Sequence, residues 1–294
     1  MTTCFKKIAL FGRIKRDGLQ ETITYLVKYL ASEKLDIFLE KETAENIPHL
    51  DLPTLPYEKI GLNSDLVIVI GGDGSLLQVA RSVVDYNTPI IGINRGRLGF
   101  LTDIHPNEVI EKLQEILRGE YKEEERFFLT AQVIQDNSVI NQQIALNEVV
   151  LMRGDNPHMM EFEIYIDEQF VCSQRADGLI VSTPTGSTAY ALSGGGPILH
   201  PSLDACVLLP MFPHTLSSRP IVINGNSEIK IAISPSHEFI ARLSCDGQNI
   251  MTVNPGNYIM IRKKEKKLRL LHPLDYRYFD TLRSKLQWET KFGL

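Results

Sequence analysis

A single aspartate interrupts a run of glycines at residues 71–74, which read Gly-Gly-Asp-Gly. The preceding Leu66–Ile70 are apolar and mostly β-branched, which predicts a strand buried on both faces of a parallel sheet. A helix capped by Ser75 is expected to follow. Open α/β sheets bind ligands at the carboxyl ends of their strands, and glycines let the backbone approach phosphate. The turn is therefore a candidate phosphate site.

The acid in this turn requires its own explanation. A carboxylate repels phosphate unless it binds a metal or a hydroxyl beside the phosphate, so Asp73 indicates chemistry at a phosphate. The alternative is a tight strand–helix turn in which Asp73 only complements the helix dipole. The sequence contains no G-x-x-x-x-G-K-[ST], and Leu77 stands where G-x-G-x-x-G needs its last glycine. Neither a P-loop enzyme nor an ordinary dinucleotide-binding dehydrogenase is expected.

The second candidate site is the segment 175–198, RADGLIVSTPTGSTAYALSGGGPI. Five hydroxyl residues fall within seven positions there: Ser182, Thr183, Thr185, Ser187 and Thr188. A strand over Leu179–Ser182 would lead into a short helix over Ser187–Leu192, whose N-terminus could present N–H and hydroxyl groups to phosphate or sugar. Tyr190 or Ala191 could cover a base. The alternative is a polar turn with a glycine-rich helix end.

Three further stretches carry polar groups in unusual places. The Asn-Glu pair at 147–148 lies inside a predicted strand, Ile144–Met152, where it is costly unless it meets a ligand or hydrogen-bond partners; otherwise it marks a strand end. Ser244–Gln248 contains a second Asp-Gly turn, most simply a hairpin. Arg95 and Arg97 lie among glycines and could offset an anionic substrate or pair with surface carboxylates.

Composition restricts the class of protein. The 294 residues suggest two domains, and the net charge of −5 argues against general binding to nucleic acid or membrane surfaces. The four cysteines are scattered and form no CxxC pair, which favours a reducing compartment. This spacing predicts neither a zinc site nor a disulfide framework. No apolar run approaches the roughly 18 residues of a membrane helix, and residues 1–12 lack a signal-peptide layout. We expect a cytoplasmic protein with no nucleic-acid or membrane partner.

The hydrophobic pattern predicts two domains of different class. The first half alternates strands (7–11, 36–39, 66–70, 89–93) with helices (20–32, 106–118), which predicts a doubly wound parallel sheet. Short strands then follow at 129–135, 144–152, 160–166, 179–182, 228–233 and 258–262, which predicts an antiparallel β-sandwich. The basic run 262–267 is interpreted as a hairpin turn. The predicted domains are 1–123, with the tail 272–294 and its helix at 276–288 packing back on it, and 124–271.

In their order and spacing, the glycine turn, the Asn-Glu pair and the segment 175–198 resemble the NAD kinase family. A bare Gly-Gly-Asp-Gly turn also resembles diacylglycerol and sphingosine kinases and, more distantly, phosphofructokinases, but the long hydroxyl and glycine segment separates NAD kinases from these. The resemblance implies an α/β domain of Rossmann-like and phosphofructokinase-like type and a β-sandwich domain that binds NAD. It also implies transfer of the γ-phosphoryl group of ATP to the adenosine 2′-hydroxyl of NAD, with a divalent metal (Mg²⁺ delivered with ATP), in a homodimer or homotetramer.

Residue roles follow from the resemblance by motif position. Asp73 matches the base that meets the 2′-hydroxyl. The implied NAD contacts are Asp73, Gly74, Asn147, Glu148, His158, Arg175, Asp177, Thr188, Ala189, Tyr190, Ala191, Leu192, Ser193 and Gln248. The phosphate-binding candidates are Gly71, Gly72, Gly74, Ser75 and Arg95. No metal ligand is indicated. The alternatives are a lipid kinase, for which no lipid-accommodating surface is evident, and a non-catalytic NAD or NADP sensor, which would not need Asp73.

Overall fold

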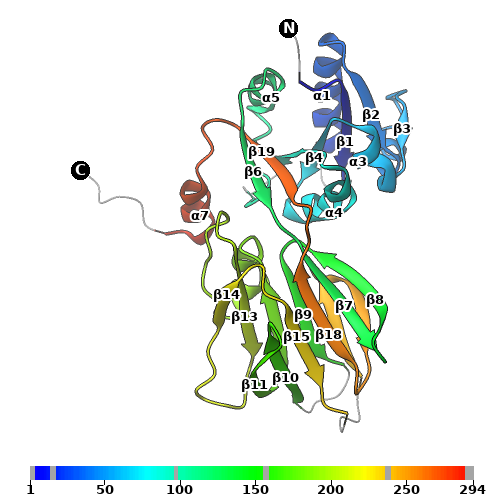
Figure 1. Ribbon diagram of the computed structural model, residues 1–294. Helices are drawn as coiled ribbons and strands as arrows, with labels where there is room; N and C mark the ends of the chain where they lie inside the picture. The colour runs from blue at the N-terminus through cyan, green and yellow to red at the C-terminus, as the bar shows by residue number, and fades with distance from the viewer. Residues whose placement is uncertain (1–3, 14–17, 96–98, 155–158, 236–239, 289–294) are drawn as a thin grey trace, which may run out of the picture. The chain divides into compact units, whose positions relative to one another are not determined.

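The computed structural model describes residues 4–13, 18–95, 99–154, 159–235 and 240–288. The chain divides into two compact units: unit 1 is Met1–Glu125 with Leu268–Leu294, and unit 2 is Arg126–Lys267. The sequence pattern predicts boundaries after residues 123 and 271 instead. The second difference arises from strand β19 (Leu268–His272), which belongs to unit 1. Figure 1 shows β19 (orange) beside β6 (green), although all of unit 2 separates them along the chain.

A seven-stranded sheet in the order β3-β2-β1-β4-β5-β19-β6 forms the centre of unit 1. Its strands are β1 (Lys7–Gly12), β2 (Asp36–Glu40), β3 (Thr54–Leu55), β4 (Leu66–Gly71), β5 (Ile90–Asn94), β6 (Lys122–Arg126) and β19. From β3 to β19 the neighbouring strands run parallel. Every residue of β4 is buried, as its unbroken apolar run predicts.

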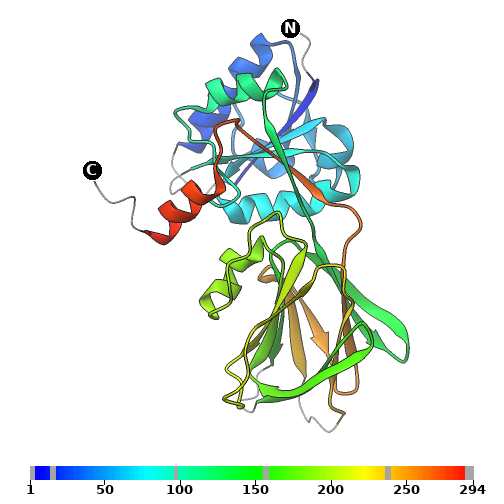
Figure 2. The same ribbon diagram turned by 60° about the vertical axis from the view of Figure 1, so that its left-hand side comes forward.

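Helices cover both faces of this sheet. The helices described in unit 1 are α1 (Leu19–Ser32), α2 (Lys41–Glu45), α3 (Ile60–Asn63), α4 (Asp73–Val83), α5 (Val109–Leu117) and α7 (Tyr278–Leu286). Alternate strand residues such as Leu10 and Ile68 join α1 and α5 in one apolar cluster, whereas α4 packs against β4 and β5 outside that cluster. Figure 2 shows α1 (blue) and α5 (green) on one side of the sheet and α4 (cyan) on the other. The predicted doubly wound fold is confirmed.

Three local predictions for this region were wrong. Helix α4 begins at Asp73 with Gly72 as its N-cap, so Ser75 is not the cap; its N–H lies within the first turn and donates to Gly72 O at 2.9 Å. Helix α5 begins at Val109 rather than at residue 106. The run 262–267 is not a hairpin turn, because β18 (Tyr258–Lys263) belongs to unit 2 and β19 pairs with β5 in unit 1.

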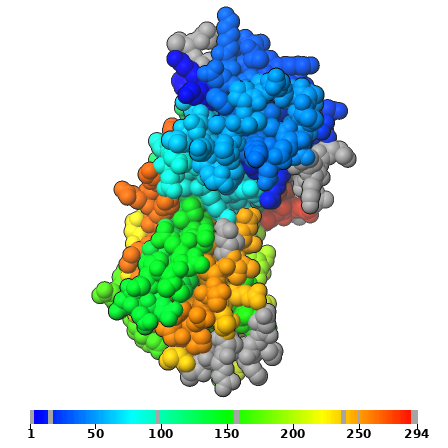
Figure 3. Space-filling model, turned by 90° about the vertical axis from the view of Figure 1, so that its right-hand side faces the viewer, coloured from blue at the N-terminus to red at the C-terminus, as the bar shows by residue number. Residues whose placement is uncertain are grey.

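Unit 2 contains two six-stranded antiparallel sheets, in the orders β11-β10-β15-β18-β7-β8 and β14-β13-β12-β9-β16-β17. The strands are β7 (Leu129–Gln135), β8 (Ser138–Ala145), β9 (Glu148–Arg153), β10 (Met160–Ile166), β11 (Gln169–Ala176), β12 (Gly178–Ser182), β13 (Ala205–Met211), β14 (Ile221–Asn224), β15 (Ile229–Ile233), β16 (Ala241–Cys245), β17 (Gln248–Val253) and β18. Buried residues of both sheets, such as Phe162 and Leu179, form one core, so the predicted β-sandwich is confirmed. Edge strand β8 is largely exposed, and Figure 3 shows the β7–β8 region (green) at the surface.

The predicted single strand 144–152 is two strands. β8 ends at Ala145 and β9 begins at Glu148, which leaves Leu146 and Asn147 between them. The predicted helix 187–192 is likewise a 3₁₀ turn over Gly186–Thr188 followed by α6 (Tyr190–Ser193). Both interruptions lie at the sequence segments with the strongest polar signals.

Candidate active site

The glycine turn of unit 1 leaves its backbone open. Gly72 has ordinary extended dihedrals (φ −108°, ψ −178°), and Gly74 lies in the first turn of α4. A Cβ added to either glycine would meet no atom within 4 Å, whereas one on Gly71 would lie 2.7 Å from Ser75 Oγ. Neither backbone strain nor packing against described residues therefore explains why positions 72 and 74 are glycines. What they provide is room for another molecule to approach the backbone at the start of a helix.

The Asp73 carboxylate is held by the loop that follows β5. Its Oδ2 accepts from Phe100 N at 2.8 Å. Its Oδ1 accepts from Leu101 N at 3.1 Å and from the N and Oγ1 of Thr102, both at 3.2 Å. A carboxylate has about four acceptor sites, two on each oxygen. Oδ2 accepts one of these hydrogen bonds and Oδ1 accepts three, so Oδ2 has the greater remaining capacity. The segment that contains this loop was singled out in the sequence for Arg95 and Arg97 among its glycines, but it was not predicted that the backbone of 100–102 would hold Asp73.

Gly99 allows that close contact. A Cβ at this position would lie 2.1 Å from Asp73 Oδ1 and 2.2 Å from Thr102 Oγ1. The Gly99 N–H also donates to Thr102 O at 3.0 Å, which closes the loop on itself. The loop can therefore wrap around the carboxylate only because residue 99 has no side chain.

In unit 2, Asn147 and Glu148 are positioned by an aspartate that the sequence reading left as a hairpin residue. The Asp246 carboxylate accepts from three successive backbone N–H groups, those of Leu146 (3.0 Å), Asn147 (2.7 Å) and Glu148 (3.2 Å). Asp246 N in turn donates to Glu148 O at 3.0 Å. The segment between β8 and β9 is thus bent around one buried carboxylate. The Asp-Gly pair in SCDGQ was the only sequence signal for it.

Glu148 is buried without full compensation. It is 5% exposed, and its Oε2 has no hydrogen-bond partner among the described residues. Burial, and then the nearby Asp246 charge, raise its pKa from 4.5 to about 8, partly opposed by a hydrogen bond from the Tyr190 backbone. At neutral pH the side chain is largely a neutral acid that can both donate and accept.

The hydroxyl cluster turns inward, which contradicts the expectation that it faces a ligand. Ser182, Thr183 and Ser187 are fully buried. The Thr183 hydroxyl donates to Leu146 O at 2.6 Å, and that of Ser187 donates to Pro184 O at 2.6 Å. These hydroxyls bind their own backbone and fasten it to the 146–147 segment, because the turn is too tight to satisfy its carbonyls otherwise.

Gly186 makes this close contact with the 146–147 segment possible. A Cβ on it would lie 2.2 Å from Asn147 O.

The predicted NAD contacts that follow Gly186 differ in exposure. Ala191 is fully buried in an apolar cluster, so its side chain does not cover a base. Tyr190 is 45% exposed, while Ser193 is exposed and Thr188, Ala189 and Leu192 are half-buried. Tyr190 is therefore the side chain of this turn that can lie on a ligand.

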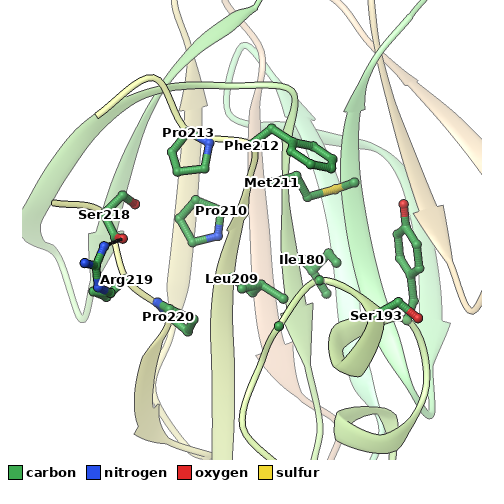
Figure 4. A pocket seen from close by; sticks show the side chains of 13 residues that line it. Ile180, Ser193, Leu209, Pro210, Met211, Phe212, Pro213, Ser218, Arg219 and Pro220 are labelled. Carbon is green, nitrogen blue, oxygen red and sulfur yellow. Dashed lines mark hydrogen bonds between the residues drawn. The ribbon is translucent and has the colours of Figure 1, made fainter. Parts of the chain in front are cut away.

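A cavity of about 460 Å³ opens beside Tyr190 and Ser193. Figure 4 shows Ile180 and Ser193 on one side of it and Ser218, Arg219 and Pro220 on the other. The Arg219 guanidinium donates to Leu216 O and Ser218 O of its own loop, at 2.9 and 2.7 Å. The remaining lining is mostly apolar.

Arg175 and Asp177, two of the implied NAD contacts, each form an ion pair with a different residue. Arg175 Nε lies 2.9 Å from Glu161 Oε1, and Asp177 Oδ1 lies 3.3 Å from Arg153 Nη1. Both ion pairs are partly exposed. Gln248 is exposed at the start of β17, two residues beyond Asp246.

The remaining candidates divide between the described and undescribed parts of the chain. Arg95 Nη1 donates to Thr22 Oγ1 at 2.7 Å, so the guanidinium lies at the start of α1. A Cβ on the adjoining Gly18 would lie 2.4 Å from Arg95 Nη2. His158 and Arg97 lie outside the described residues.

Neither a metal centre nor a membrane span is assembled by the described parts of the chain. Within the ranges given above, no three His, Cys, Asp or Glu side chains come together as metal ligands, and no helix has both the length and the apolar character to cross a membrane. The carboxylate at the glycine turn is already bound by four loop donors. The described residues do not by themselves form a metal site.

The parallel-sheet unit with its open glycine turn and the β-sandwich unit are the two domains expected of the nucleotide phosphotransferases that the sequence resembles. Models of the ATP-NAD kinase N-terminal and C-terminal domains match residues 8–121 and 146–273. An NAD kinase of Pseudomonas entomophila (strain L48) is 54% identical, and one of Pseudomonas putida (strain GB-1) is 53% identical, each over 98% of both chains. The chain belongs to the NAD kinase family, whose activity is the ATP-dependent phosphorylation of NAD to NADP.

Solved structures agree with this assignment. Yeast NADH kinase complexed with NADH matches with a TM-score of 0.90 and 25% identity, over 100% of this chain and 91% of that one. An NAD kinase from Archaeoglobus fulgidus in complex with ATP matches with a TM-score of 0.73 and 25% identity, over 95% of this chain and 99% of that one. The two-unit architecture is therefore that of NAD and NADH kinases.

Proposed function

We propose that Asp73 is the base of the reaction, taking the proton of the 2′-hydroxyl on the adenosine ribose of NAD as the γ-phosphoryl group of ATP is transferred to it. The supporting observation is the open backbone of Gly72 and Gly74 directly beside the carboxylate. Phosphoryl transfer needs alignment and charge neutralisation more than a strong base. A hydrogen-bonded carboxylate suits that role, because it can accept the proton late, once the phosphorus–oxygen bond has begun to form.

The less loaded oxygen of Asp73 is the acceptor in this proposal. Oδ2 has one hydrogen bond, from Phe100 N, and so keeps a lone pair for the incoming hydroxyl. Oδ1, with three donors, fixes the orientation of the group. The proton passes to Oδ2, the phosphoryl group joins the ribose oxygen, and ADP leaves. Backbone N–H groups of 71–74 would face the phosphates, while Ser75 is buried beneath Gly71.

Unit 2 supplies the NAD-binding residues in this proposal. Asp246 holds Asn147 and Glu148 through their backbone N–H groups, and the Tyr190 backbone hydrogen-bonds to the neutral Glu148 acid, next to the exposed Tyr190 ring. The unpartnered Oε2 of Glu148 is the strongest support, because a buried polar atom without a partner costs about 1 to 3 kcal/mol unless a ligand satisfies it. Ribose hydroxyls and the adenine edge offer the complementary donors and acceptors. The ring of Tyr190 can lie on the base.

Three further properties complete the proposal. Mg²⁺ arrives bound to ATP, since this cation keeps most of its water and needs only one or two protein oxygens. The chain works in the cytoplasm, which is supported by its four free cysteines. It works as a homodimer or homotetramer, as the family resemblance implies.

The test is to incubate the purified protein with ATP, Mg²⁺ and NAD and to measure NADP with an NADP-specific dehydrogenase. NADP should form in proportion to enzyme and require both ATP and the metal. Parallel reactions with diacylglycerol or sphingosine in place of NAD should give no phosphorylated lipid. A lipid product without NADP would favour the lipid-kinase alternative, and NAD binding without turnover would favour a sensor.

A further inference from the structure

A buried histidine lies behind the loop that holds Asp73. His272, the last residue of β19, is fully buried, and its Nδ1 lies 2.8 Å from Asp103 Oδ2. Its Nε2 lies 3.6 Å from Glu124 Oε2 on β6, and its ring stacks on that of Tyr276 at 3.9 Å. One imidazole thus lies between two carboxylates from two different elements. The described contacts of Asp73 and the nucleotide sites involve none of these side chains directly.

The backbone connects this histidine to the glycine turn. Thr102, which donates twice to Asp73 Oδ1, directly precedes Asp103. Ile104, which directly follows Asp103, forms a parallel bridge with Ile93 and donates its N–H to Gly92 O at 3.2 Å. The segment 102–104 therefore has three anchors in a row: Asp73 at one end, β5 at the other and His272 in the middle. Freeing the middle anchor would loosen the end that holds the carboxylate.

The close packing of this segment makes it sensitive to such a change. Thr102 is fully buried, and a Cβ on Gly92 would lie 2.8 Å from its Cα. The side chain of Asp103 is 5% exposed, and its second oxygen, Oδ1, has no hydrogen-bond partner among the described residues. A buried carboxylate with one oxygen unbonded depends on its remaining partner. That partner is His272.

We propose that His272 is a positioning residue for the phosphoryl-transfer site, and that its ion pair with Asp103 fixes the loop whose amides orient the Asp73 carboxylate. The proposal rests on the proposed role of Asp73. It assigns to β19, the strand that returns from unit 2, a task in catalysis as well as in the sheet.

The charge state of the pair supports this role. Burial by itself lowers the pKa of His272, but Asp103 and Glu124 outweigh burial and raise it above its usual value. The other charged groups nearby line a cavity of about 220 Å³ with Asp103: Glu108, Lys112, Asp275, Arg277 and Asp280. Lys112 and Asp275 pair with each other at 2.9 Å. The His272 imidazole is thus the side chain that Asp103 contacts directly, at 2.8 Å.

The first test is a double-mutant cycle with Asp73. Displacement of a reacting group by about 1 Å costs up to 10²-fold, so His272→Gln should lower kcat by about 10- to 10²-fold. The KM values for NAD and ATP should stay within about twofold, because the binding groups are untouched. In an Asp73→Asn background the same change should give little further loss, because the histidine acts through Asp73. Equal losses in both backgrounds, or an unchanged kcat, would overturn the proposal.

Matched variants separate positioning from general destabilisation. Asp103→Asn keeps an oxygen that can accept from Nδ1 but removes the charge, so it should lower kcat by a similar factor. It takes the place of His272→Gln in the test if that variant does not fold. Asp275→Asn changes another acid of the same cavity and should leave kcat within about twofold. A comparable loss in Asp275→Asn would show a nonspecific effect on the cavity and contradict the proposal.

A spectroscopic measurement keeps this inference separate from the role of Asp73. In ¹H–¹⁵N spectra, the amides of Phe100, Leu101 and Thr102 should shift in His272→Gln, since they donate to Asp73. If Asp73→Asn keeps turnover, the proposed base is wrong, yet these shifts still test whether His272 fixes the loop. Unchanged amide shifts would overturn the positioning role whatever the kinetics of Asp73→Asn.

Discussion

The glycine turn of unit 1 and the hydroxyl turn of unit 2 use similar residue types in opposite ways. At 71–74 the backbone is open and the one acid is surrounded by donors from a neighbouring loop. In the segment 182–188 the hydroxyls of Ser182, Thr183 and Ser187 donate to backbone carbonyls and lie inside the fold. In unit 2 the group with unused hydrogen-bonding capacity is instead Glu148.

The difference shows how ligand-facing groups are recognised. A polar side chain whose hydrogen bonds are already made within the fold has little left to offer a ligand, whatever its type. Two features are stronger indications of a ligand site: a glycine whose missing side chain is not explained by packing, and a buried oxygen without a hydrogen-bond partner. By this criterion Gly72, Gly74 and Glu148 are better ligand candidates than Ser182, Thr183 or Ser187. The following predictions test that ranking.

The largest effect is expected at Asp73. Asp73→Asn should lower kcat by about 10² to 10⁴-fold while NAD binding persists, because it removes the base. The amide nitrogen of asparagine cannot accept from the loop, so thermal unfolding must be measured alongside NADP formation. Calorimetric NAD binding is the control for folding. Turnover near that of the wild type would show that Asp73 is not the base.

The next effect is a pH dependence at Glu148. The pKa of Glu148 is raised in the folded state, so folding keeps a proton that the unfolded chain loses, and stability falls between about pH 4.5 and about pH 8. Glu148→Gln removes this loss, which is at most about 1.4 kcal/mol for each pH unit. Urea denaturation at several pH values should show that the free energy of unfolding of the variant rises relative to that of the wild type up to about pH 8. A gap that does not change with pH would contradict the raised pKa.

A pair of glycine substitutions makes the comparison of the two turns directly. In Gly186→Ala the new Cβ would meet Asn147 O at 2.2 Å, so the backbone must shift, at a cost of about 1 to 3 kcal/mol. In Gly72→Ala it meets nothing, so stability should change by less than about 1 kcal/mol while kcat/KM for ATP falls. Urea denaturation and steady-state kinetics measure both. Equal destabilisation of the two variants would remove the distinction between the turns.

The smallest effects are expected at Arg175 and Asp177. Each lies in a partly exposed ion pair, and the loss of such a pair costs about 0 to 1 kcal/mol. We expect Asp177→Ala to raise the KM for NAD and Arg175→Ala to change the ratio of NAD to NADH phosphorylation. Glu161→Gln is the control, since it breaks the Arg175 pair but keeps the guanidinium. If this control reproduces Arg175→Ala, or if neither KM nor the ratio changes, the residues serve only their ion pairs.

Sequence reasoning succeeded where structure is decided locally. The run Leu66–Ile70 and the short strands of unit 2 were predicted correctly, because the spacing of apolar residues and the flanking turn residues are visible within a few positions of the sequence. The strand β19 was missed because its partner, β5, lies far earlier in the chain. The gap at 146–147 was missed for the same reason, since Asp246 creates it from a distant turn.

The site was predictable in part. The turn around Asp73 was found because glycine and acid types at a strand end carry meaning without tertiary information. The hydroxyls of 182–188 were misinterpreted, because only the folded chain shows whether a hydroxyl already has a backbone partner. The Phe100–Thr102 cradle uses backbone N–H groups, which every sequence has, so no residue type could reveal it.

The insertion of β19 between β5 and β6 has a consequence for the order of folding. During synthesis, unit 2 is finished as one continuous stretch, whereas the sheet of unit 1 lacks an interior strand until residues 268–272 leave the ribosome. Until then β5 has an unpaired edge, which can pair wrongly with another chain. Unit 1 is therefore completed after unit 2, although most of it is synthesised earlier, and nascent chains that stall before β19 should be the ones that aggregate.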